Sequence, residues 1–425
     1  MRILIISKEA WRDEQNGGNV LSNIFRDFDA EFAQIYCNEQ QPNNNICSTY
    51  YQITDKQMVQ SLFSSKKAGH YLYTKGIKED VIPKQQTYSG LRKWLKTTLP
   101  IFREIVWSLG NWNTAELKQF ICEFNPDIIF APCYGSHYMH RLTALAQAVT
   151  KVNVISYISD DHYTNAQFRW EPWFWINHFL LRRHTKRIFK HYSLVYTMTD
   201  EQKIQCERDF HANMKILRKA GEFNTPKTKL TSQRPIRFIY AGGLYLNRWK
   251  TLSLLVKAMQ EIDPNGELFH LYIYSNNILP KHAQQLLNNQ INSELHSAVS
   301  AERLHSEYLR SDIALHCESF DIVNRLKVRM SFSTKIVDCL DSGCAVMAIC
   351  DPKQAGWAYL KRNDAAICIS SYEEIRNALL QIVSNPGIID SYQQKAFALG
   401  RRNHLYDTVS QSIKSDFLSL SRQSS

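Results

Sequence analysis

Short apolar runs rich in Val, Ile, Phe and Tyr alternate with stretches of helical periodicity along the whole chain. In the first half these runs predict strands at Arg2–Ser7, Asp127–Ala131, Asn153–Ile158 and Leu194–Thr197. Each run is apolar at nearly every position, which is typical of parallel strands covered by helices on both faces. The polar, Asn-rich stretch Asn38–Tyr51 interrupts the pattern, so we expect a loop there.

A polar, proline-containing segment separates the first half from a second series of the same pattern. We therefore expect a first domain over 1–221, a linker over 222–235, a second domain over 236–400 and a C-terminal helix over 401–425 that returns to the first domain. Helices are expected between the strands, and both domains are predicted to be doubly wound α/β units. The strands of the second domain are expected at Ile236–Ala241, Leu268–Tyr274, Ile313–His316, Ala345–Ile349 and Ala365–Ile369.

Composition narrows the class of protein. The 425 residues are enough for two domains with their own cores, and an apolar content of 44% argues against disorder. Ten cysteines occur without Cys-x-x-Cys spacing, and six of them lie within or beside apolar runs, so we expect these to be reduced, buried thiols and the location to be cytoplasmic. The 51 Lys and Arg residues exceed the 40 Asp and Glu residues, and the net charge of +11 favours an anionic partner.

Two glycines open a helical segment shortly after the first predicted strand, at Gly17 and Gly18. The backbone N–H groups of such a pair can approach a phosphate, and the helix dipole adds its positive end. An ordinary turn between a strand and a helix would use glycine equally well for its backbone freedom.

A second glycine pair, Gly242-Gly243, follows the first strand of the second domain, and Arg248 and Lys250 lie near the start of the next helix. Two flexible cations beside the amides of a helix N-terminus can bind a pyrophosphate. A solvated helix start is the alternative interpretation.

The most informative segment is Ser331–Ala348. Ser333 or Thr334 can cap a helix there, and their hydroxyl and N–H groups would then face a docked anion. Lys335 adds a positive charge. Asp338 lies about one helical turn later on the same side, where a carboxylate can accept hydrogen bonds from a ribose.

Within this segment, FSTKIVDCLDSGCAVMA resembles the donor-nucleotide motif of the retaining glycosyltransferases of family four, which have the GT-B fold. YAGGLYLNRWKTL is similar to the family's phosphate loop, and ISKEAWRDEQNGGN is similar to its N-terminal Gly-rich loop. The resemblance implies two Rossmann-like domains that face a cleft. It also implies that Asp338 binds the ribose, that Gly17 and Gly18 close over the donor, and that the diphosphate is held by Ser333, Thr334, Lys335, Arg248 and Lys250.

One position departs from the family pattern. Many members carry Glu-x7-Glu, in which the first carboxylate contacts the donor sugar; here Asp338 takes the second place and Met330 the first. The sugar-contacting carboxylate is therefore missing or supplied from elsewhere, and Glu318 and Asp321 are the catalytic candidates in this domain. Further positive charge for the leaving diphosphate is expected from Lys327 and Arg329.

In the first domain, Asp160, Asp161 and His162 follow the strand Asn153–Ile158, at the sheet edge where ligands bind in such folds. Asp160 and His162 are catalytic candidates through contact with the acceptor or the sugar, and a loop Asp pair that caps the next helix is equally open. The resemblance implies that basic residues and helix dipoles neutralise the diphosphate, so we expect no metal and no cofactor. A pair of histidines, His137 and His140, resembles an acceptor-side loop or has a structural role.

Two stretches combine basic and aromatic residues, Gly90–Trp112 and Phe168–Tyr192. They are predicted either to contact an anionic membrane as interfacial helices or to pack in the core with a basic outer face. No run approaches the about 18 uncharged apolar residues of a membrane span. Association would therefore be peripheral, at the inner face of the plasma membrane.

The leading hypothesis is a glycosyltransferase that uses a UDP- or GDP-type nucleotide sugar and acts with retention on a glycan or lipid-diphosphate acceptor in cell-surface polysaccharide synthesis. A nucleotide-sugar epimerase on the same fold is the alternative. Nucleic-acid binding would also use the positive charge, but helix-turn-helix, zinc and RNA-binding signatures are absent from the sequence, so no nucleic-acid partner is expected.

Overall fold

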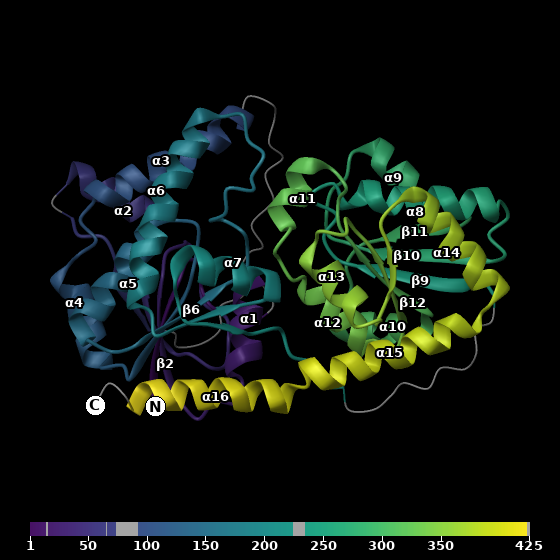
Figure 1. Cartoon of the computed structure of the whole chain (residues 1–425). Helices are drawn as coiled ribbons and strands as arrows, with labels where there is room; N and C mark the ends of the chain where they lie inside the picture. Colours follow the sequence, from purple (N-terminus) through teal and green to yellow (C-terminus); the bar gives the residue numbers. More distant parts are fainter. Residues whose placement is uncertain (14–15, 65, 74–91, 224–233, 423–425) are drawn as a thin grey trace. The chain divides into compact units, whose positions relative to one another are not determined.

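The computed structural model describes residues 1–13, 16–64, 66–73, 92–223 and 234–422. Most of the linker expected over 222–235, and the first two residues of the stretch Gly90–Trp112, lie outside the described residues. The chain divides into two compact units, which are described separately below (Figure 1). The first unit comprises Met1–Asn165, Arg169–Leu217 and Ser410–Ser425, and the second comprises Ala166–Phe168 and Arg218–Val409.

The described part of the first unit is built on a sheet of eight strands in the order β4-β3-β2-β1-β5-β6-β7-β8, parallel except for the pair of β3 and β4. Strands β1, β5, β6 and β7 confirm the four strands predicted from apolar runs, to within one residue at either end. The strands are β1 (Arg2–Ser7), β2 (Glu31–Tyr36), β3 (Thr49–Gln52), β4 (His70–Tyr73), β5 (Ile128–Pro132), β6 (Val154–Ile158), β7 (Leu194–Thr197) and β8 (Met214–Ile216).

The loop predicted over Asn38–Tyr51 is wrong at its C-terminal end, where β3 pairs in parallel with β2. Tyr50 and Tyr51 are both buried, and their burial places this short strand inside the sheet. The preceding Asn and Pro residues hide the strand because they break the apolar periodicity on which the prediction rests.

Helices cover both faces of this sheet. One face carries the large core that includes Phe120 of α4 and Tyr138 of α5. On the opposite face, the ring of Phe417 in the C-terminal helix α16 (Tyr406–Arg422) packs 5.6 Å from Phe25 and 6.0 Å from Phe130, between ring centroids. The other helices of the unit are α1 (Asn16–Phe25), α2 (Asp55–Phe63), α3 (Arg92–Leu109), α4 (Ala115–Phe124), α5 (His137–Thr150), α6 (Pro172–Ile188) and α7 (Asp200–Phe210), with a 3₁₀ turn at Phe189–His191.

The second unit contains a six-stranded parallel sheet, in the order β11-β10-β9-β12-β13-β14 within the described residues. All five strands predicted for this half are present, and β11 adds an edge strand that its mixed polar sequence SELH did not indicate. The strands are β9 (Ile236–Ala241), β10 (Phe269–Tyr274), β11 (Ser293–His296), β12 (Ile313–Cys317), β13 (Ala345–Ile349) and β14 (Ile367–Ile369).

The C-terminal segment is helical and is interrupted near Pro386, as its Asn-Pro-Gly sequence predicts. A second interruption occurs at Leu405, which is extended and forms a β-bridge with Gly221, so the last helix begins at Tyr406 and not at the expected 401. The helices of the second unit are α8 (Arg248–Ile262), α9 (Lys281–Leu287), α10 (Ala301–Arg310), α11 (Ile322–Val328), α12 (Thr334–Asp341), α13 (Ala355–Arg362), α14 (Tyr372–Ser384) and α15 (Gly387–His404).

Candidate nucleotide-binding site

The strand order of the second sheet reverses direction between β9 and β12. Loops that leave two such neighbouring strands turn to opposite faces of the sheet, and the crevice between them is the usual ligand site of open α/β folds. Gly242-Gly243 follow β9, and Glu318 follows β12. The structure therefore brings together two segments of the sequence-predicted site that lie 75 residues apart.

Arg248 and Glu318 form a buried ion pair at this point. Nε and Nη2 of Arg248 donate to the two carboxylate oxygens of Glu318, each at 2.8 Å, and both side chains are less than 10% exposed. Burial lowers the pKa of Arg248, but the Glu318 carboxylate and its hydrogen bonds outweigh burial and raise that pKa above its ordinary value. Glu318, which the sequence offered as a catalytic candidate, thus fixes and neutralises a cation of the same predicted site.

Lys335 lies against the glycine pair. A Cβ atom built on Gly242 would come within 2.1 Å of Cε and 2.4 Å of Nζ of Lys335, so only glycine allows this approach. Burial and the nearby Arg248 charge lower the pKa of the Lys335 ammonium, and Glu318 opposes them. A bound anion would relieve this unfavourable charge, as expected of a residue that binds phosphate.

His316, at the end of β12, belongs to the same cluster and was missed by the sequence analysis. Its side chain is 2% exposed, and Nε2 has no hydrogen-bond partner among the described residues. Burial and the charges of Arg248 and Lys335 lower its pKa to about 3, so the ring is neutral at physiological pH. The sequence signal that could have identified His316 is a polar residue near the end of the otherwise apolar run IALHC.

Helix α12 begins where the motif predicts. Ser333 is its N-cap residue, but the Ser333 side chain makes no capping hydrogen bond. Gly343, with a φ of +75°, follows the helix in the left-handed conformation that glycine favours.

The predicted ribose ligand Asp338 has a partner that the sequence did not reveal. Oδ1 of Asp338 accepts a hydrogen bond from Nζ of Lys219 at 2.5 Å, and the two residues are 119 positions apart. The Asp338 side chain is 43% exposed, so the carboxylate remains accessible to a ligand. Lys219 can therefore orient the carboxylate, and the role of Asp338 in ribose binding stays a prediction.

Asp321 is the N-cap residue of α11. Its carboxylate accepts from Asn324 N–H at 3.0 Å, from Asn324 Nδ2 at 2.8 Å and from Asn247 Nδ2 at 3.1 Å, and it also accepts the Ser319 hydroxyl. Burial raises the pKa of Asp321, but these hydrogen bonds outweigh burial and hold it at about 2. The geometry favours a role in fixing the loop after β12, and a catalytic role stays a prediction.

The remaining candidates of this unit are more dispersed. Lys250 is exposed and its Nζ lies 5.6 Å from the centroid of the Trp249 ring. Lys327 is exposed and Arg329 is half-buried. Met330 is 3% exposed, which explains an apolar residue where the family pattern has a glutamate.

The candidates of the first unit lie at its own strand ends. Gly17 and Gly18 fall in the first turn of α1. After β6, His162 Nε2 lies 3.9 Å from Asp160 Oδ2 and both are exposed, whereas Asp161 is buried and accepts from the N–H and hydroxyl of Thr164 at 3.0 and 2.5 Å. Asp161 thus closes a local turn with Thr164, whereas the N-cap residue of the next helix, α6, is Glu171. The roles of Asp160, His162 and the two glycines stay predictions.

The histidine pair packs inside the first unit. His140 is buried and its ring lies 5.4 Å from that of His184 on α6, and His137 Nδ1 lies 3.1 Å from His184 Nδ1. Burial, helped by the neighbouring histidines, lowers the pKa of His140 to about 3. These contacts favour the structural interpretation.

The second basic aromatic stretch contains helix α6, which exposes both aromatic and basic side chains. Trp173, Ile176 and Phe179 are more than half exposed, and Arg183 and Lys186 are exposed further along the same helix. No helix within the described ranges is long and apolar enough to cross a membrane. Contact with an anionic membrane surface stays a prediction.

Two doubly wound units, the second with its polar cluster at a switch point, are the architecture of the GT-B fold, and the chain has this fold. No protein-family model and no curated protein sequence matches the chain.

Similar solved structures include HepE of Anabaena in complex with UDP, which aligns with 99% of this chain and 100% of that chain at a TM-score of 0.63 and 12% identity. Sucrose-phosphate synthase of Thermosynechococcus elongatus aligns over 99% and 98%, at a TM-score of 0.61 and 11% identity. A UDP-forming α,α-trehalose-phosphate synthase of Burkholderia vietnamiensis aligns over 99% and 100%, at 0.58 and 11%. Likeness at these identities establishes the fold alone.

Proposed function

We propose that this protein is a glycosyltransferase that moves a sugar from a UDP- or GDP-type nucleotide sugar to a glycan or lipid-linked acceptor. The observation that carries the proposal is the cluster of Lys335, Arg248 and the N-terminus of α12 at the switch point of the second sheet. A nucleoside diphosphate matches this concentration of positive charge and free amide groups. HepE was solved with UDP, and the trehalose-phosphate synthase is described as UDP-forming, which favours uridine as the base.

In this proposal the bond between the anomeric carbon and the diphosphate breaks, and the electron pair leaves with the diphosphate. Because Glu318 already neutralises Arg248, the ammonium of Lys335 supplies most of the positive charge available to that leaving group. The acceptor hydroxyl attacks the anomeric carbon, a new C–O bond forms, and the hydroxyl proton passes to the departing diphosphate. The proposal further includes membership of family four, net retention of configuration, and a reaction without metal or cofactor. These three points rest on the motif resemblance alone.

We further propose that the acceptor is an intermediate of cell-surface polysaccharide synthesis. The reaction would then take place in the cytoplasm, at the inner face of the plasma membrane. The exposed aromatic and basic residues of α6 support this part of the proposal, since aromatics and cations together suit the headgroup region of an anionic bilayer.

A donor-turnover assay tests the reaction. The chain is incubated with a panel of UDP- and GDP-sugars, and free UDP or GDP is measured over a long incubation. Without an added acceptor, water takes the sugar, so slow hydrolysis of the donor reports the activity. We expect slow release of one nucleoside diphosphate, its loss in Lys335→Ala, and normal release in Lys257→Ala, which removes an exposed lysine from α8. Conversion to another nucleotide sugar without free nucleoside diphosphate would instead show an epimerase, and an untouched panel would contradict both activities.

A further inference from the structure

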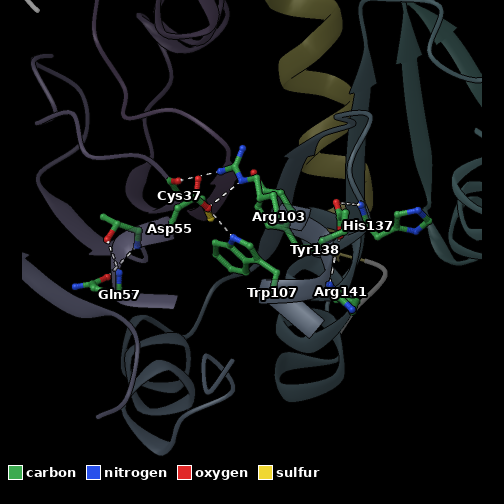
Figure 2. Close-up of polar contacts among 10 residues, drawn as sticks. Cys37, Asp55, Gln57, Arg103, Trp107, His137, Tyr138 and Arg141 are labelled. Atoms are coloured by element: carbon green, nitrogen blue, oxygen red, sulfur yellow. Dashed lines mark hydrogen bonds and ion pairs between the residues drawn. The ribbon is translucent and has the colours of Figure 1, made fainter. Parts of the chain in front are cut away.

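The first unit contains a cavity of about 600 Å³ that none of the sequence-predicted site residues lines. It lies where the strand order of the first sheet reverses, between the loops that follow β1 and β5. Lys8 comes from the first loop, Gly135 and Ser136 come from the second, and helices α2, α3, α5 and α6 supply the remaining lining. Figure 2 shows part of this wall, with Arg103 between Asp55 and Tyr138.

Three polar groups of the lining lack partners. Nζ of Lys8 forms no hydrogen bond or ion pair with another described residue. The hydroxyl groups of Ser136 and Tyr138 are buried and have no hydrogen-bond partner among the described residues. Tyr138 as a whole is only 1% exposed. Ser136 is the N-cap residue of α5, yet its side chain does not cap the helix. Lys8 is half-buried, and buried hydroxyl groups such as those of Ser136 and Tyr138 are rarely left without a hydrogen-bond partner, so this lining offers one cation and two hydroxyl groups to a bound molecule.

The two carboxylates of the lining are already compensated. Asp55 accepts from Arg103 Nε at 2.9 Å and from Trp107 Nε1 at 2.7 Å. Glu104 accepts from the backbone N–H groups of two residues in the first turn of α5, at 2.7 and 3.1 Å, and lies 3.5 Å from an arginine of the same helix. The positive charge of Lys8 is therefore the unbalanced one.

Burial and the repulsion from Arg103 lower the pKa of Lys8, while Glu9 and Asp55 oppose the shift. An anion beside the ammonium would reverse this cost. Two hydroxyl donors close to such an anion would add hydrogen bonds that are stronger for being made to a charged group.

Helices α2 and α3 also supply apolar side chains to the lining. Val59 of α2 and Leu99, Phe102 and Val106 of α3 line the cavity, and Leu99 and Phe102 are 56% and 60% exposed. Removing this apolar surface from water would stabilise a complex with an apolar ligand. A ligand that uses the whole cavity therefore has an apolar portion as well as a charged group.

We propose that this cavity binds an anionic amphiphile, with a phosphate or carboxylate group contacting Lys8, Ser136 and Tyr138 and an apolar portion packed against Leu99 and Phe102 of α3. On the proposed function, this ligand is the lipid-linked acceptor; the binding itself requires no donor and no turnover. Its test is therefore independent of glycosyl transfer.

Isothermal titration calorimetry of the full-length chain with decyl phosphate, below its micelle-forming concentration, measures the binding directly. Inorganic phosphate supplies the charge alone, and decyl maltoside supplies the chain with an uncharged head. We expect decyl phosphate to bind at least about tenfold more tightly than either of the other two, since both halves of the cavity contribute. Absence of decyl phosphate binding, or equal binding of one of the partial ligands, would overturn the proposal.

Matched variants locate the site. Lys8→Gln and Ser136→Ala should weaken decyl phosphate binding, the former about tenfold, whereas Lys118→Gln changes an exposed lysine of α4 and should have no effect. Phe102→Ala should weaken binding through the chain, and Leu109→Ala, an exposed residue of α3 outside the cavity, should not. Unchanged affinity in Lys8→Gln and Ser136→Ala, with melting temperatures showing both variants folded, would place the ligand elsewhere and refute the assignment.

Discussion

Replacing Glu318 with alanine is expected to lower the free energy of unfolding by about 3–5 kcal/mol, the cost of leaving one member of a buried ion pair without its partner. Glu318 is 4% exposed and holds both Nε and Nη2 of Arg248. Its backbone carbonyl also accepts from the Thr251 hydroxyl at 2.8 Å, which ties the loop after β12 to α8. Without the carboxylate, Arg248 and Lys335 would repel each other beside a neutral histidine.

Denaturation by urea, followed by circular dichroism, measures this effect. The matched control is Glu302→Ala, which removes an exposed carboxylate from α10 of the same unit and should change stability by less than about 0.5 kcal/mol. A Glu318→Ala protein as stable as the wild type, but without turnover, would show instead that Glu318 is a catalytic carboxylate and that its pairing with Arg248 contributes little to stability.

Lys335→Ala is expected to weaken the binding of the preferred nucleoside diphosphate by about 100-fold without unfolding the protein. No carboxylate among the described residues forms an ion pair with the Lys335 ammonium, and burial together with the Arg248 charge lowers its pKa. Asp338→Ala should also abolish donor binding, if Asp338 holds the ribose as the motif implies.

Titration calorimetry with UDP and GDP checks both variants, and Lys257→Ala is the control for Lys335→Ala because it makes the same charge change. Gly242→Ala provides a second route to the same site, because the added Cβ would displace the Lys335 side chain while the charge remains in the protein. Gly387→Ala is its matched control, since a Cβ there would have its nearest neighbour at 3.5 Å. Wild-type affinity in both Lys335→Ala and Asp338→Ala would refute the site assignment.

The sequence predicts those parts of the fold that depend on local pattern. Continuous apolar runs identify the central parallel strands, such as β1 and β13, because both faces of these strands are buried. The short strand β3 escapes prediction because its two buried tyrosines follow a polar Asn-rich loop. The start of helix α12 is predicted by its cap residue, Ser333.

In the candidate site too, local segments could be predicted from the sequence and contacts between distant segments could not. Gly242, Arg248 and Lys335 could be identified because each lies in a recognisable local segment at a strand end or a helix start. The contacts between distant segments could not be predicted. Lys219 bonds to Asp338, which lies 119 positions later. Lys8 appears in the sequence only as a lysine after an apolar strand, and the strand order is what brings it beside the loop after β5. Contacts between distant segments depend on the order of strands in the sheet, which local patterns do not encode.

The most direct test of the central claim is calorimetry of the full-length wild-type chain with UDP, GDP and the nucleosides uridine and guanosine. A diphosphate-binding cluster at the switch point of the second unit predicts that one of the two nucleoside diphosphates binds and that its nucleoside, at the same concentration, does not. Failure of both diphosphates to bind, or a nucleoside that binds as tightly as its diphosphate, would contradict the assignment of Lys335 and its neighbours to a nucleotide-sugar donor.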